Sequence, residues 1–183
     1  MMRFGRVFIV GAVVLLAFTA GFSGDKKKDS KAPSAPLPKP IVTAKTAFLV
    51  KGPGSDPYLK GGGDLAFDTF YADMKAWGKY QIVDTPDQAD IVFELSYSSR
   101  QVGTSVWSST NTYTGATQVY SSPDMDPRVS LNVYDRKTGF VLWSAAEARD
   151  TARRRKNREK NLIKAVHDMV SNLRMRTENT ESE

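Results

Sequence analysis

Apolar and polar residues alternate most regularly near the middle of the chain. Ile91, Phe93, Leu95 and Tyr97 recur at every second position, with Glu94 and Ser96 between the last three. Side chains of a strand point alternately to its two faces, so this spacing predicts a half-buried strand over residues 91–99.

A second alternating segment lies further along the chain and precedes turn-forming residues. Val129, Leu131 and Val133 alternate with polar residues, and the sequence DRKTG follows at residues 135–139. Apolar residues resume at Phe140. This pattern predicts a hairpin of two antiparallel strands.

Two other segments have helical spacing. The first has a candidate N-cap at Asp64, a candidate stop at Gly78, and apolar residues between them at Leu65, Phe67, Phe70, Met74 and Trp77. The last helix of the chain is predicted by a single apolar stripe at Leu162, Val166, Met169, Val170 and Leu173.

Short apolar runs at residues 46–50 and 80–85 predict two more strands. The order along the chain is then strand, helix, strand, strand, hairpin, strand, strand, helix. We therefore predict an α+β fold, with a single, mostly antiparallel sheet of about four to six strands and two main helices packed on one face.

The segment at residues 100–127 is rich in serine, threonine, asparagine and glycine. We predict a long, partly exposed hairpin that turns near residues 114–115; the alternative is a flexible loop. Trp107, Tyr113 and Tyr120 lie in this segment and are candidate contacts for a partner, because aromatic and small hydroxyl side chains are typical of protein- and carbohydrate-binding surfaces. The alternative is that they pack the hairpin onto the domain.

The N-terminus has the layout of a bacterial secretory signal peptide. Arg3 and Arg6 precede an uncharged apolar stretch at residues 7–24. We therefore expect an exported protein, periplasmic or secreted. The alternative is a protein anchored in the inner membrane through the same stretch, left uncleaved.

The remaining boundaries follow from composition. Prolines and lysines in the next segment predict an extended linker, and acidic residues at the C-terminus predict a short tail. The expected organisation is a signal peptide at 1–24, a linker at 25–40, one α/β domain at 41–176 and an acidic tail at 177–183.

Charge is distributed unevenly along the chain. The net charge is +6, but the signal peptide carries +2 and residues 25–51 carry +5, so the rest of the chain is at −1. Within residues 52–183, the segment 149–161 carries a net charge of +5. The basic candidates for partner contact in this run are Arg149, Arg153, Arg154, Arg155, Lys156, Arg158 and Lys160.

The basic run is a local patch on an otherwise acidic domain. It contains no aromatic residue for base stacking, and an exported protein rarely meets nucleic acid, so we expect no nucleic-acid partner. It also lacks large apolar residues, so any membrane contact would be a weak electrostatic one. We expect the partner to be an envelope protein or an anionic envelope surface. The alternative is a solvated entry to the last helix.

The residues needed for common catalytic and metal sites are scarce. The chain has no cysteine and one histidine, His167, at the edge of an apolar stripe. We therefore expect no metal site and no cofactor, and we name no catalytic residue. The glycine-rich sequence GPGSDPYLKGGGD lacks the ending of a phosphate-binding loop, which favours a role in the loop itself.

Two local sequences carry a resemblance to a known group. YQIVDTPDQADIVFELSYS links two strands through a short turn and the dipeptide AD, and VSLNVYDRKTGFVLWS precedes the last helix. Together they resemble the small exported α/β domains of the TolB amino-terminal, LpoB and CsgG-like group, which includes many uncharacterised secreted proteins. The resemblance implies a non-enzymatic module that docks other envelope proteins, and it supplies no site residues.

These observations favour an exported, non-catalytic protein-binding or assembly-accessory module of the bacterial envelope. One alternative is a hydrolase that uses two carboxylates on envelope glycan, since the separation of such a pair is not visible in sequence. Another is a surface protein that self-associates through its Ser/Thr-rich hairpin. The sequence leaves the oligomeric state open.

Overall fold

The computed structural model describes residues 36–152 and 154–181. The predicted signal peptide, most of the predicted linker and Arg153 lie outside the described residues. In the part of the chain that is described, no helix is both long and apolar enough to cross a membrane.

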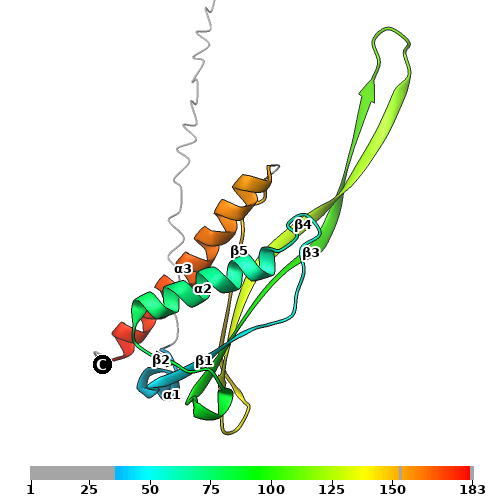
Figure 1. Cartoon of the computed structure of the whole chain (residues 1–183). Helices are drawn as coiled ribbons and strands as arrows, with labels where there is room; N and C mark the ends of the chain where they lie inside the picture. The colour runs from blue at the N-terminus through cyan, green and yellow to red at the C-terminus, as the bar shows by residue number, and fades with distance from the viewer. Residues whose placement is uncertain (1–35, 153, 182–183) are drawn as a thin grey trace, which may run out of the picture. The chain divides into compact units, whose positions relative to one another are not determined.

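A single five-stranded sheet forms the centre of the fold (Figure 1). Its spatial order is β2-β1-β3-β4-β5. β1 runs parallel to both of its neighbours, and the other pairs are antiparallel. The strands are β1 (Thr46–Lys51), β2 (Gln81–Ile82), β3 (Ile91–Thr110), β4 (Thr117–Asp135) and β5 (Val141–Ala148).

The two main helices, α2 (Gly62–Trp77) and α3 (Arg155–Glu181), pack on one face of this sheet (Figure 1). The α+β prediction is therefore confirmed. α2 ends at Gly78, as predicted, where φ is 68°. It begins at Gly62, so Asp64 lies in its first turn instead of capping it. A short helix, α1 (Lys39–Thr43), and a 3₁₀ turn, η1 (Pro86–Gln88), complete the elements.

The alternation in β3 accounts for how the sheet meets the helices. Ile91, Phe93 and Leu95 are buried, and the ring of Phe93 contacts the rings of Phe70 on α2 and Tyr80. The residues between them face the other side of the sheet, where the Tyr134 hydroxyl donates to Glu94. One face of the sheet therefore holds the core, and the other carries polar side chains together with half-buried apolar ones such as Phe48 and Val92.

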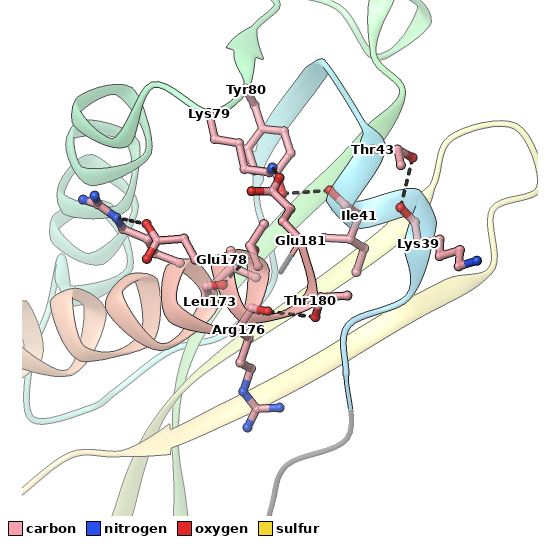
Figure 2. A network of polar contacts seen from close by, with 12 residues as sticks. Lys39, Ile41, Thr43, Lys79, Tyr80, Leu173, Arg176, Glu178, Thr180 and Glu181 are labelled. Atoms are coloured by element: carbon pink, nitrogen blue, oxygen red, sulfur yellow. Dashed lines mark hydrogen bonds and ion pairs between the residues drawn. The ribbon is translucent and has the colours of Figure 1, made fainter. Parts of the chain in front are cut away.

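The core extends beyond both predicted domain limits, where the end of α3 lies beside α1 (Figure 2). Leu37 is buried, and its backbone N–H donates to the side chain of Thr180 on α3. The Tyr80 hydroxyl donates to the carbonyl of Ile41. Thr177, which we placed in an acidic tail, is fully buried within α3. The predicted tail is wrong because its first residues continue the helix and cover the core.

β3 and β4 continue together far beyond the other strands (Figure 1). β1 pairs with β3 only as far as Leu95, and β5 pairs with β4 only as far as Arg128. Residues 100–127 therefore form a two-stranded ribbon, which we call the arm; the rest of the described chain is the body. The hairpin prediction is confirmed over the loop alternative.

The tip of the arm is a short turn at residues 111–116. The Asn111 side chain accepts hydrogen bonds from the backbone N–H groups of Tyr113 and Thr114, and Gly115 has a φ of 69°. A bulge at Gln101–Gly103 breaks the pairing register near the base. Bulges increase strand twist and bend the ribbon, so we expect this one to twist the arm near its base.

Candidate functional site

The outer part of the arm, residues 103–122, is uncharged and partly apolar. Residues 103–122 contain no Asp, Glu, Lys or Arg, although these make up 25% of the chain. Several large side chains in this segment are exposed, with fractional exposures of 65% at Val106, 98% at Tyr113 and 70% at Val119. Exposed apolar side chains without flanking charges are typical of contact surfaces.

Trp107 and Tyr120 form an aromatic pair across the arm. They are opposite each other in the β3–β4 ladder, with ring centroids 5.9 Å apart and ring planes at 18°. Both rings stay about half exposed. The three predicted aromatic contacts therefore do not fasten the hairpin to the core: two stack on each other along the arm and Tyr113 lies at its tip.

A cleft of about 520 Å³ lies at the base of the arm. β4 contributes Met125 and Pro127, the loop after β1 contributes Asp56 and Tyr58, and α3 contributes Arg158. The cleft therefore lies where the arm, the glycine-rich loop and the start of α3 meet.

A buried ion pair joins these elements behind the cleft. Arg149 Nη2 donates to Asp56 Oδ2 at 3.1 Å, and the two side chains are 3% and 1% exposed. The Tyr97 hydroxyl donates to the same carboxylate oxygen, and the Arg149 guanidinium lies 5.4 Å from the centre of the Tyr97 ring. The Tyr58 backbone N–H donates to Asp56 Oδ1. Both oxygens of Asp56 are thus engaged, which gives the residue a structural role and disfavours it as one half of a hydrolytic carboxylate pair.

The basic run divides into structural and exposed residues. Arg149 is buried in the ion pair, and its Nη1 donates to the carbonyl of Arg158 at 2.9 Å. Arg158 itself donates to the carbonyls of Ala152 and Tyr58, with its guanidinium over the Tyr58 ring. These two arginines connect the body internally, so they do not belong to a fully solvated entry to the last helix.

The other described members of the run face solvent at the start of α3: Arg154, Arg155, Lys156 and Lys160. Arg155 pairs with Glu159 one turn along the helix. Exposed pairs of this kind contribute little to stability. Together these four residues can present positive charge to an anionic surface.

The glycine-rich loop between β1 and α2 lies directly against β3. A Cβ atom at Gly52 would lie 2.2 Å from Ser96 Oγ, and one at Gly62 would lie 2.5 Å from the ring of Tyr97. Gly54 has a φ of 143° and would place a Cβ 2.4 Å from a backbone oxygen. These glycines allow the loop to approach the strand, which explains them without phosphate binding.

His167 and the other carboxylates form separate contacts. His167 Nδ1 bonds Asp73 on α2, and its side chain is about half exposed. Asp124 accepts from Ser105, and Asp126 accepts from Arg128. Within the described ranges, no three His, Cys, Asp or Glu side chains gather closely enough to hold a metal ion.

Burial alters the acid–base behaviour of two tyrosines. Burial is the main cause that raises the pKa of Tyr80, and burial followed by the hydrogen bond to Asp56 raises the pKa of Tyr97. The folded chain therefore holds these protons above about pH 10, where an unfolded tyrosine loses its proton. Since the folded state then binds more protons than the unfolded state, stability falls as pH rises past 10.

We expect an alkaline titration of tyrosine absorbance to end in a step that coincides with unfolding. Tyr80 and Tyr97 ionise in that step. The Tyr80→Phe variant should show a smaller step. Complete tyrosine ionisation while the circular dichroism of the folded chain persists would contradict this expectation.

No protein-family model matches the sequence. A search of curated proteins also finds no match. Solved structures of small bacterial α/β domains do resemble the chain.

Three of these solved structures come from different bacteria. A DUF4136 family protein from Bacteroides thetaiotaomicron is 15% identical with a TM-score of 0.44, and covers 75% of this chain and 92% of its own. A neuraminyllactose-binding hemagglutinin homologue from Helicobacter pylori is 9% identical with a TM-score of 0.43, covering 70% of this chain and 83% of its own. The PelC dodecamer from Paraburkholderia phytofirmans is 15% identical with a TM-score of 0.42, covering 69% and 85%.

Proposed function

We propose that this chain is an exported, non-catalytic module that binds envelope proteins or assists their assembly, with the arm as its contact element. The observation that carries the proposal is the arm itself, which extends from the body and is uncharged and partly apolar over residues 103–122. Export rests on the N-terminal sequence. The order of the elements and the two quoted local sequences support placing the chain in the TolB amino-terminal, LpoB and CsgG-like group.

The physical argument concerns what the arm leaves exposed. Val106 and Val119 are 65% and 70% exposed, and they lie on the face of the ribbon opposite the Trp107–Tyr120 pair. Covering apolar surface is favourable by roughly 25 cal/mol per Å². Both faces of the arm can gain from contact, whereas in the body α2 and α3 already cover one face of the sheet.

The ribbon is also suited to contact because its shape is set in advance. The ladder between β3 and β4 continues from the sheet to Thr110 and Thr117, whose hydroxyls bond each other at 3.0 Å. A surface that is ordered before binding loses less conformational entropy when a partner docks. The exposed basic residues at the start of α3, Arg154 to Lys156 and Lys160, provide a second contact for an anionic envelope surface.

Site-specific photo-crosslinking of the full chain in its native bacterium tests the proposal. A benzophenone side chain placed at Tyr113 or Val106 should give covalent adducts with envelope proteins. Tyr71 on α2 is the matched control, since it is 40% exposed but belongs to the body. Adducts from the control at equal yield, or none from either arm position, would remove the arm as the contact element.

A further inference from the structure

The two edges of the arm differ in their capacity to add another strand. The backbone N–H of Arg149 donates to the carbonyl of Pro127 at 2.9 Å, so the polar backbone groups of Pro127 point away from β3. Alternate residues of a strand point their backbone groups the same way. The outward positions of β4 along the arm are therefore Met125, Pro123, Ser121 and Val119.

Proline occupies two of the outward positions nearest the body on β4. A proline has no N–H to donate, and natural sheets use it to block pairing at exposed edges. Pro123 and Pro127 therefore protect the β4 edge near the base of the arm, in the same region as the cleft.

The β3 edge has no such protection. Ser99 N–H donates to the carbonyl of Ser55, which covers the edge near the body. Beyond the bulge, the register places Thr104 opposite Pro123 and Ser108 opposite Val119. The outward positions of β3 are therefore Thr104, Val106, Ser108 and Thr110. Each keeps its N–H and carbonyl, and no charged residue or proline lies between 103 and 122.

We propose that this β3 edge pairs antiparallel with the β3 edge of a second copy of the chain. The inference deepens the proposed function, because it rests on the arm as contact element and names one partner. A two-fold axis near Trp107 matches the outward residues of the two copies: Thr104 lies opposite Thr110 of the second copy, and Val106 opposite Ser108 of the second copy. About eight backbone hydrogen bonds would form along this stretch.

The register is favoured by the aromatic side chains. It places Trp107 directly opposite Trp107 of the second copy on the face that already carries Tyr120. Cross-strand aromatic pairs stabilise antiparallel sheets. The result is a four-stranded ribbon with an aromatic row of tyrosine, two tryptophans and tyrosine across one face.

A second copy fits this edge better than a different protein because of charge. A two-fold interface brings the same segment of both copies together, so a charge on this edge would lie near the same charge of the second copy and be repelled by it. Residues 103–122 carry none. An uncharged edge also lacks a charge pattern that could select a strand of one particular other protein.

Disulfide trapping tests the register, because the chain has no cysteine of its own. In the proposed ribbon Ser105 lies opposite Ser109 of the second copy, at positions where the two Cβ atoms approach within about 5 Å. Purified full-length Ser105→Cys and Ser109→Cys chains should form a disulfide-linked dimer when mixed and oxidised in mild detergent. Neither variant alone should crosslink, since its own cysteines lie about 13 Å apart.

The matched control uses the same face of the other strand. Gln118→Cys and Ser122→Cys are equally spaced on β4 and would crosslink only if the β4 edges paired. Equal or greater crosslinking of that pair, or no crosslinking of the Ser105 and Ser109 variants when mixed, would overturn the proposal.

Proline variants give an independent readout by sedimentation. Ser108→Pro removes an outward N–H from β3 and should reduce the sedimenting mass from two chains to one. Val119→Pro removes the outward N–H directly across the ladder on β4 and should leave the dimer intact. A wild-type chain that sediments as a monomer, or a dimer that survives Ser108→Pro, contradicts the pairing.

The two proposals can fail separately. If Tyr113 crosslinks to other envelope proteins while the purified chain stays monomeric, the pairing is wrong and the docking function stands. If the mixed cysteine variants crosslink but the arm captures only other copies in the cell, the pairing stands and docking to other envelope proteins fails.

Discussion

Replacing Asp56 by alanine should lower the free energy of unfolding by about 3–5 kcal/mol, since removal of one partner leaves the other charge buried and uncompensated. The Arg149 side chain is only 3% exposed, and its charge is balanced by Asp56 alone among the ion pairs of the described residues. The Tyr97 hydroxyl would lose its acceptor in the same variant. Urea denaturation of the full chain measures the change.

An exposed ion pair provides the matched control. Lys51 and Asp64 join the end of β1 to α2, and their side chains are 51% and 69% exposed. Lys51→Ala should leave the urea midpoint nearly unchanged, because water replaces the lost partner. If Asp56→Ala is no more destabilising than Lys51→Ala, the buried pair does not hold the loop, β3 and α3 together.

The importance of this pair could not have been read from the sequence. Asp56 and Arg149 are 93 residues apart. Asp56 stands in a loop among glycines and prolines, and Arg149 begins a run of basic residues. Both settings are typical of solvated side chains, and only the folding of the loop onto β3 removes them from water. No local pattern records that contact.

The strands and helices were predictable because their signals are local. The alternation at Ile91, Phe93 and Leu95 follows from a strand with one buried face, and it needs no knowledge of the partner element. The C-terminal limit failed for the opposite reason. Thr177 lies among polar and acidic residues, yet α1 and the loop at Tyr80 converge on that end of α3 and bury it. Contacts between segments that are far apart in the sequence produce no periodic pattern from which they could be predicted.

The arm was predictable as a hairpin but not as a ribbon detached from the body. Its turn residues and its mixture of serine, threonine and aromatics indicated two strands. The contrast between its edges depends on which backbone groups point outward, and a single bulge at Gln101–Gly103 sets that on β3. The aromatic pair similarly depends on register, which places Trp107 opposite Tyr120.

The arm should be dispensable for folding and required for association. Its large side chains lie outside the core cluster, and Val106, Tyr113 and Val119 remain mostly exposed. Replacing residues 104–123 by Asn-Gly would join Gly103 to Asp124, a pair that faces inward in the ladder, through a favoured two-residue turn. The body would keep every buried residue of its core.

Sedimentation velocity of this arm-shortened chain, measured beside its thermal unfolding, tests the central claim most directly. We predict an unfolding midpoint close to that of the wild type together with complete loss of self-association and of arm-dependent crosslinks. A shortened chain that still associates, or one that unfolds at a much lower temperature, would contradict the separation of a contact arm from a self-sufficient body.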